Sequence, residues 1–171
     1  MLGNKLPDME LKALIKGEIE KVRFSEYEGK YLVIIMYPYD FTFVCPTEVN
    51  EISISADKFL EINTQVLYLS CDSIYSHITW SMIDRTDSGV RGVRWPMLSD
   101  YKKEFSQKMN LLDKDGHSMR ATIIVNAEGI IKHISANDSM VGRNVPEILR
   151  LIKAFKYVEK CGEVCHVNWD N

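Results

Sequence analysis

Tyr31–Pro46 has the sequence YLVIIMYPYDFTFVCP and predicts a buried strand that leads directly into a helix. Tyr31–Tyr37 is an apolar run of strand length, rich in β-branched and aromatic residues. Pro38 ends this strand, and Pro46 suits the opening of a helix, where its missing N–H leaves no hydrogen bond unmade. The apolar residues that follow recur at helical spacing: Val49, Ile52, Ala56 and Phe59.

Cys45 lies in the first turn of this predicted helix. A sulfur there faces backbone N–H groups without partners and the positive end of the helix dipole, which together favour the nucleophilic thiolate. Thr42, three residues earlier, can direct a hydroxyl into the same pocket. The pattern alone leaves two alternatives open. A free cysteine is most often a small buried apolar residue, and Thr42 can be a turn or capping residue.

At these residues the chain resembles a known family. Pro38-x-x-x-Thr42-x-x-Cys45 matches the active-site pattern of the peroxiredoxins, and the longer run Asp40–Glu48 resembles their typical 2-Cys subgroup. The resemblance covers almost the whole chain in the family's order, and a match of this length is very specific. It continues through Asp72-Ser73, Ser76–Trp80, Pro96–Asp100, Val141–Arg143 and Gly162–Cys165.

The resemblance implies a role for each matched residue. Cys45 corresponds to the peroxidatic cysteine, and Cys165 corresponds to the resolving cysteine. The other matched positions are the active-site residues Pro38, Thr42 and Arg120 and the supporting residues Glu48 and Trp80.

Arg120 and Thr42 carry side chains suited to cleaving a peroxide. A thiolate attacks one oxygen while the other leaves as hydroxide, so donors aimed at both oxygens stabilise the developing charge. Thr42 can donate, and Arg120 adds a permanent cation with fixed donors that favours the thiolate of Cys45. Taken alone, an arginine before the strand-like run Ala121–Val125 is usually solvated. Only the resemblance favours its functional interpretation.

The composition limits the classes of function. A chain of 171 residues predicts one domain with a sizeable core. Its 21 basic and 24 acidic residues give a net charge of -3 without a basic block, which argues against nucleic acid and anionic membranes as partners. No apolar run has transmembrane length and no signal-peptide pattern is present, so we expect a cytoplasmic protein, with an earlier-removed leader left open.

The four cysteines do not form the pattern of a disulfide framework in a chain of this length. Cys71 ends an apolar run and is predicted to be a buried strand residue, whereas Cys161 and Cys165 are expected in a tail beyond the last helix. The tail cysteines with His166 or His117 suggest a zinc site only weakly, because a second ligand pair of recognised spacing is missing. We expect no metal or organic cofactor. Surface or supporting positions are expected for His77, His117 and His133.

Strand and helix patterns alternate along the chain and predict an α/β sandwich around a mixed sheet. The resemblance makes this a thioredoxin-like fold, with an N-terminal β-hairpin and a C-terminal tail that carries the resolving cysteine. We expect a peroxidase domain over residues 1–160 and the tail over residues 161–171. The expected elements are a hairpin of Met9–Leu14 and Ile19–Phe24, strands Tyr31–Tyr37 and Val66–Cys71, helix Ile74–Ile83 with Ser73 as N-cap, a hairpin of Ala121–Val125 and Ile130–Ser135, and a final helix whose apolar face includes Val145, Ile148 and Ile152.

Two departures from the family concern its regulation. Members sensitive to overoxidation carry Gly-Gly-Leu-Gly where this chain has Ser88–Arg91, and they continue after the resolving cysteine into a helix with a Tyr-Phe motif, whereas this sequence ends at Asn171. His166 also replaces the usual proline, and Cys161 is an addition that can compete with Cys165. Cys45, Thr42 and Arg120 are untouched, so we expect a working peroxidase that resists overoxidation.

The sequence therefore predicts a thiol-dependent peroxidase for hydrogen peroxide and small organic hydroperoxides. The resemblance implies a homodimer with intersubunit Cys45–Cys165 disulfides, which can assemble into a decamer and is recycled by a thioredoxin-type reductant. Two alternatives stay open. A thiol–disulfide oxidoreductase of the same fold would carry Cys-x-x-Cys, but residue 48 is Glu. A holdase chaperone or peroxide-sensing relay depends on assembly, which the sequence does not test.

Overall fold

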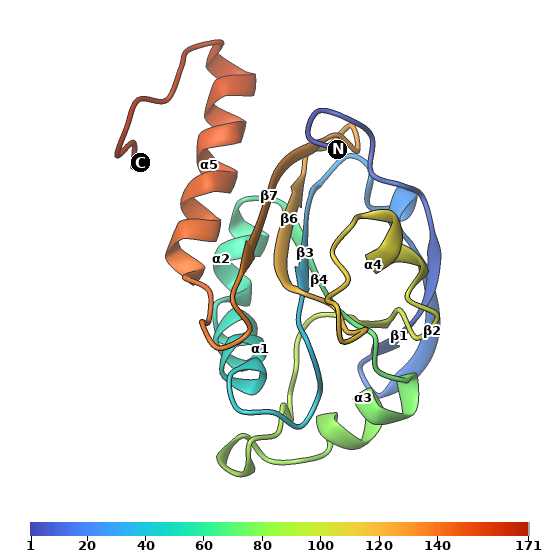
Figure 1. Ribbon diagram of the computed structural model, residues 1–171. Coiled ribbons are helices and arrows are strands. Elements are labelled where there is room, and N and C mark those ends of the chain that lie inside the picture. Colours follow the sequence, from blue (N-terminus) through green and yellow to red (C-terminus); the bar gives the residue numbers. More distant parts are fainter. Residues whose placement is uncertain (171) are drawn as a thin grey trace.

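A computed structural model describes residues 1–170, which form a seven-stranded mixed sheet with helices on both faces (Figure 1). The strand order across the sheet is β2-β1-β5-β4-β3-β6-β7. The strands are β1 Glu10–Ile15, β2 Glu18–Arg23, β3 Tyr31–Met36, β4 Thr64–Ser70, β5 Met97–Ser99, β6 Arg120–Val125 and β7 Ile131–Asn137. The helices are α1 Cys45–Ile54, α2 Ala56–Glu61, α3 Ile74–Ser81, α4 Glu104–Lys108 and α5 Val145–Cys161.

The central strand β3 is buried along its whole length because both faces of the sheet are covered. Alternate residues of β3 belong to two core clusters, one shared with α1, α2 and α5 and the other with α4. Figure 1 shows α1, α2 and α5 together on one side of the sheet and α4 on the other. A strand covered on both faces is apolar throughout, which is why a continuous run marked it in the sequence.

The N-terminal hairpin pairs β1 with β2 in antiparallel register, from Glu10 opposite Arg23 to Ile15 opposite Glu18. Its two turn residues, Lys16 and Gly17, have φ angles of 50° and 89°. Two residues at positive φ give the turn whose twist matches that of the paired strands. The predicted hairpin is thus confirmed, within one residue of its expected ends.

Several predicted elements are also present. Ser73 caps α3 by accepting a hydrogen bond from the backbone N–H of Ser76, at 3.2 Å. The second hairpin is β6–β7, and Asn144 caps α5 by accepting from the N–H of Glu147. The predicted helix after Cys45 is interrupted at Ser55 into α1 and α2, yet Val49 of α1 and Phe59 of α2 still share one core.

Two cysteine placements were wrong. Cys161 is the last residue of α5 and not part of the tail, because the helix continues until Gly162, which adopts a φ of 70° and ends it. Cys71 follows β4 instead of ending it, and its side chain is half-buried. Its sulfur lies 3.2 Å from the hydroxyl of Ser118 and 3.7 Å from that of Ser106.

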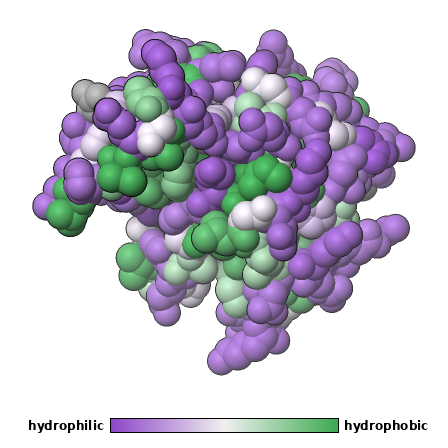
Figure 2. All heavy atoms as spheres, turned by 90° about the horizontal axis from the view of Figure 1, so that it is seen from above, coloured by the Kyte–Doolittle hydropathy of each residue, from purple (hydrophilic) through white to green (hydrophobic). Residues whose placement is uncertain are grey.

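The surface seen from above is mostly hydrophilic, with separate apolar patches (Figure 2). Within residues 1–170, no helix combines the length and the apolar character needed to cross a membrane.

Candidate active site

Cys45 is the first residue of α1 and is only 1 % exposed. The loop of residues 38–44 brings the chain from the end of β3 to this helix. The N-cap residue is Val44, whose apolar side chain cannot accept a hydrogen bond from the first turn. Pro46 has no N–H, and the backbone N–H groups of Thr47 and Glu48 donate to the carbonyl oxygen of Val44 at 3.1 and 3.3 Å, so the expected unpaired donors are not free in this first turn. The positive end of the helix dipole still lies at the sulfur.

Arg120 reaches the sulfur from β6. Strands β3 and β6 are antiparallel with Ile35 opposite Thr122, so Arg120 lies beside the end of β3, where the loop to Cys45 begins. Its Nη2 lies 3.5 Å from Sγ of Cys45, and its Nη2 and Nε donate to the carbonyl oxygen of Ser139 at 2.7 and 3.1 Å. Arg120 is 3 % exposed, so it is not the solvated arginine of the alternative interpretation.

Glu48 holds Arg120 in place together with a second arginine. Its carboxylate accepts from Nη1 of Arg120 and, at 2.7 to 2.9 Å, from Nη2, Nε and the backbone N–H of Arg143. Arg143 also donates to the carbonyl oxygens of Met36 and Ala121, both at 2.7 Å. Burial alone would raise the pKa of Glu48, but the charges of Arg143 and Arg120 hold it below its ordinary value. Glu48 is therefore an anion that fixes two buried guanidinium groups.

A hollow of about 220 Å³ opens above the sulfur and brings together four of the predicted site residues. Its lining includes Pro38, Thr42, Cys45 and Arg120. The hydroxyl of Thr42 donates to the carbonyl oxygen of Tyr39 at 3.0 Å, so its lone pairs remain available in the hollow. The buried thiol is thus accessible to a small molecule from one side, with a cation and a hydroxyl beside it.

The predicted supporting residue Trp80 does not line this hollow. It is fully buried under the loop, where its ring lies 5.9 Å from that of Tyr37 and 6.1 Å from that of Phe41. Its Nε1 donates to the carbonyl oxygen of Ser88 at 2.9 Å. Trp80 therefore packs against Phe41 of the loop and connects it, through the hydrogen bond to Ser88, to the segment after α3.

Comparisons with known proteins agree with this arrangement. Residues 2–134 match the model of the AhpC/TSA family. The chain belongs to this family. It is 48% identical over 165 residues to the mitochondrial thioredoxin-dependent peroxide reductase of Drosophila melanogaster, covering 96% of this chain and 70% of that protein. It is 42% identical over 170 residues to the thioredoxin peroxidase of Echinococcus granulosus, covering 99% and 88%.

Solved structures of the AhpC/TSA family share the fold. The reduced 2-Cys peroxiredoxin of Plasmodium vivax superposes with a TM-score of 0.96 at 35% identity, over 99% of this chain and 89% of that one. Enterococcus faecalis AhpC gives a TM-score of 0.90 at 34% identity, over 96% and 98%. The expected thioredoxin-like fold and the identification as a peroxiredoxin are both confirmed.

Cys165 is not brought to Cys45 within this peroxiredoxin chain. Its sulfur faces the carbonyl oxygen of Ala154, at 3.7 Å, because the tail after Gly162 folds back along α5. The backbone carbonyl of Trp169 accepts from Arg150 at 2.9 Å, and the Trp169 ring lies 5.4 Å from that of Tyr157. All four cysteines are free. A reaction between Cys45 and Cys165 requires a second chain or a movement of the tail.

Sequence reasoning missed two features of the site. Arg143 lay within a matched segment but received no role, because its partner Glu48 is 95 residues away. Asp40 and His77 form a buried pair under the loop, with Nδ1 of the ring 2.8 Å from the carboxylate. His77 is fully buried, so the expectation of a supporting position holds and that of a surface position does not. Only their contacts in three dimensions reveal both features.

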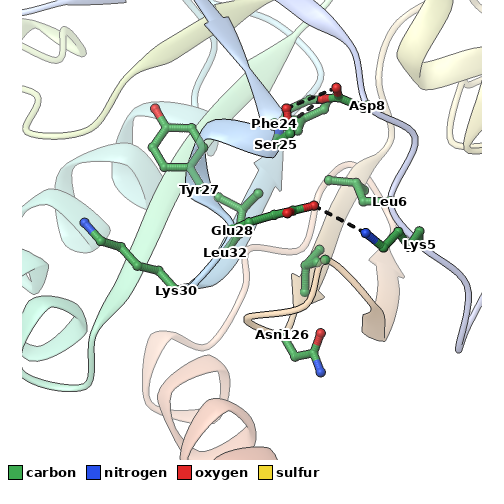
Figure 3. A pocket seen from close by; sticks show the side chains of 12 residues that line it. Lys5, Leu6, Asp8, Phe24, Ser25, Tyr27, Glu28, Lys30, Leu32 and Asn126 are labelled. Carbon is green, nitrogen blue, oxygen red and sulfur yellow. Dashed lines mark hydrogen bonds and ion pairs between the residues drawn. The ribbon is translucent and has the colours of Figure 1, made fainter.

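A further hollow lies outside this site, and a cluster of possible metal ligands lies at its edge, since His117 also lines the hollow above Cys45. A hollow of about 160 Å³ near the N-terminus is lined by Phe24, Leu32 and Asn126 and is crossed by an ion pair of Lys5 with Glu28 at 3.4 Å, but it contains no cysteine (Figure 3). Asp113, Asp115 and His117 bring ligand atoms within 4.8 Å of one another. Among the described residues this group includes neither tail cysteine, so it does not support the zinc site considered for them.

Proposed function

We propose that this chain is a thiol peroxidase in which Cys45 attacks the peroxide. The observation that carries the proposal is the contact of Arg120 Nη2 with the Cys45 sulfur, at 3.5 Å, on the floor of a hollow that also contains Thr42. The names of its relatives, thioredoxin-dependent peroxide reductase and thioredoxin peroxidase, support the same reaction.

In the first step the thiolate of Cys45 bonds to one oxygen of the peroxide, and the O–O bond breaks. The sulfur loses two electrons and becomes a sulfenic acid, and the other oxygen leaves as hydroxide or alkoxide and takes up a proton. Arg120 is placed to donate to the oxygens while negative charge develops on them, and the lone pairs of Thr42 can accept the proton of a bound peroxide. The step balances with these residues and the peroxide, and needs no metal or organic cofactor.

In the second step the sulfenic acid condenses with the thiol of Cys165 from a second copy, forming a disulfide and releasing water. Cys45 is buried and begins α1, so a second cysteine reaches its sulfur only after the first turn of α1 opens. The tail that carries Cys165 must also leave α5. A thioredoxin-type dithiol then reduces the disulfide by exchange.

The homodimer, its decameric assembly and the cytoplasmic location are part of this proposal. The Drosophila melanogaster relative is named as mitochondrial. Analytical ultracentrifugation of the reduced and oxidised protein tests the assembly, and cell fractionation tests the location.

An NADPH-coupled assay with hydrogen peroxide tests the activity, comparing the thioredoxin and glutathione systems as the source of electrons. Peroxide-dependent NADPH consumption with thioredoxin, lost in Cys45→Ser, is expected. The holdase alternative is separated by client aggregation, since a chaperone that does not depend on peroxide chemistry would keep its effect in Cys45→Ser. A wild-type protein that prevents aggregation but does not turn over peroxide would overturn the proposal.

A further inference from the structure

His77 on α3 is a buried histidine that has a hydrogen-bond partner at each ring nitrogen. Its Nε2 lies 3.2 Å from the carbonyl oxygen of Leu98, and its Nδ1 lies 2.8 Å from Oδ2 of Asp40. A carbonyl oxygen can only accept, so Nε2 must carry a hydrogen. The neutral ring has one N–H, so a neutral His77 would leave Nδ1 without a proton opposite a carboxylate.

The surroundings of Asp40 suit a carboxylate anion. Its Oδ1 accepts from the hydroxyl of Tyr37 at 2.8 Å, so both of its oxygens face donors once His77 carries two protons. The two groups are 0 % exposed at the side chain, and a buried charge is tolerated only when it is paired and hydrogen-bonded. This geometry satisfies every polar atom of the pair.

We propose that His77 is an imidazolium whose ion pair with Asp40 positions the loop that carries Thr42 and Cys45. This inference rests on the proposed peroxidase function, since the peroxide is the molecule that the loop would orient. Neither His77 nor Asp40 is among the residues that line the hollow at Cys45, so they act as positioning residues.

The loop needs such an anchor because its backbone is strained next to Asp40. Phe41 has a φ of 56°, a strained left-handed conformation that a residue with a side chain keeps only where its surroundings impose it. Thr42 follows directly, and its hydroxyl position depends on the carbonyl oxygen of Tyr39. Asp40 is held at the side chain by His77 and at the backbone N–H by Asp72, at 2.9 Å. The pair therefore fixes the turn from which Thr42 projects.

The groups that face His77 define how the pair responds to pH. They are Tyr37 directly after β3, Asp40 in the loop that follows, Asp72 after β4, and the carbonyl of Leu98 on β5. Burial alone would lower the pKa of His77, but its hydrogen bond to Asp40 and the Asp40 charge raise it above the ordinary value. The proton is therefore lost at a higher pH than from an unperturbed histidine, and the loss leaves the Asp40 anion buried without its partner.

The sign of the effect on stability follows from the raised pKa. The folded protein binds this proton more tightly than the unfolded chain does, so the contribution to stability is complete below the unfolded pKa of about 6.5. It is lost as the pH rises through the folded pKa. We expect the peroxidase rate to fall over the same pH range.

Nitrogen NMR of the histidine-labelled wild-type protein tests the charge directly. We expect both ring nitrogens of His77 to be protonated at pH 7, with deprotonation only at higher pH. A His77 ring with a single protonated nitrogen at pH 7 would overturn the proposal. This readout does not involve peroxide, so it distinguishes a failure of this inference from a failure of the proposed function, which the wild-type peroxidase assay measures.

Kinetics of His77→Gln test the positioning role. Glutamine cannot carry the charge, and a displaced Thr42 should lower kcat/KM for hydrogen peroxide by roughly tenfold to a hundredfold. The fall of the rate that follows His77 deprotonation should disappear. His133→Gln is the matched control, because His133 is half-buried on the edge strand β7, opposite Ile124. If His77→Gln does not fold, Tyr37→Phe removes one donor to Asp40 and should give a smaller loss in the same direction. Wild-type rates and pH profile in the folded variant would contradict the proposal.

Discussion

Replacing Arg120 by lysine keeps a positive charge but removes the planar arrangement of donors, and we expect kcat/KM for hydrogen peroxide to fall about a hundredfold. The guanidinium group reaches three partners at once: the sulfur of Cys45 at 3.5 Å, the carbonyl oxygen of Ser139 at 2.7 Å, and the carboxylate of Glu48. A lysine ammonium is a single point of charge on a flexible chain, and it cannot reproduce this geometry.

The magnitude follows from the contact that is lost. Two unit charges 3.5 Å apart attract by about 4.7 kcal/mol at an effective dielectric constant of about 20. This energy is an upper bound on the loss in Arg120→Lys, because the negative charge of Glu48 weakens the attraction between Arg120 and the sulfur and because lysine is also positively charged. The directed donor is what disappears, and a hydrogen bond to a charged group contributes about 1.5–3 kcal/mol. Removal of one donor to a developing oxyanion costs about 10²–10³ in rate, so a hundredfold loss is the lower end of the expected range.

The assay is single-turnover oxidation of the reduced protein, in which Cys45 sulfenic acid formation is followed by quenching and mass spectrometry. Arg143→Lys is the matched control, since Arg143 also pairs with Glu48 but is not among the residues that line the hollow at Cys45. Both variants should lose stability, and only Arg120→Lys should lose most of the rate. Equal losses in the two variants would show that the rate depends on the Glu48 ion pairs alone, and wild-type oxidation in Arg120→Lys would refute the reasoning.

Three further predictions concern the cysteines, Glu48 and overoxidation. Cys45→Ser should abolish turnover, and Cys71→Ser should leave it nearly intact, because burial raises the pKa of the Cys71 thiol. Cys165→Ser should consume one equivalent of peroxide but lose the covalent dimer on a non-reducing gel, and a dimer band that persists would indicate Cys161 as a substitute. Glu48→Gln should destabilise the protein by about 3–5 kcal/mol in urea unfolding at pH 7, because two buried guanidinium groups lose their anion. The pKa of Glu48 is lower in the folded protein than in the unfolded chain, so ionised Glu48 stabilises the protein fully at a pH above its unfolded pKa. This stabilisation is lost as the pH falls through the folded pKa, and the stability difference between wild type and variant should therefore shrink in acid. Because Ser88–Arg91 replaces the loop of sensitive members, Cys45 should form disulfide faster than sulfinic acid at millimolar peroxide, and predominant sulfinic acid in mass spectra would contradict this.

The sequence was sufficient for most of the fold because its local signals agree. Pro38 and Pro46 mark the end of β3 and the start of α1, and Lys16-Gly17 supplies the positive φ angles that the first hairpin needs. The short elements β5 and α4 were not predicted. Three residues of β5 give too little periodicity to detect, and α4 begins after Lys103 in a left-handed conformation that lysine rarely adopts. The last helix extends to Cys161 because only Gly162 ends it.

The site was predicted through its individual residues and not through their pairings. Thr42, Cys45 and Arg120 belong to a recognisable pattern, so the family resemblance is sufficient to identify each of them. Glu48 with Arg143 and Asp40 with His77 are pairs separated by 95 and 37 residues. A single sequence does not indicate which carboxylate meets which cation, because that choice depends on the register of β3 with β6 and on how α3 packs.

The charges around the sulfur explain why these pairings matter for the chemistry. Arg120, Arg143 and Glu48 are all buried and close together, and their formal charges leave one positive charge without a partner. A buried charge without a partner is costly, so a negative charge on the neighbouring sulfur completes the group. The same positive charge is available to the peroxide oxygens as negative charge moves from sulfur to the leaving oxygen. Arg120 is already in place before the O–O bond breaks, so the protein does not reorganise during that step. Donors that are fixed in this way accelerate a reaction most.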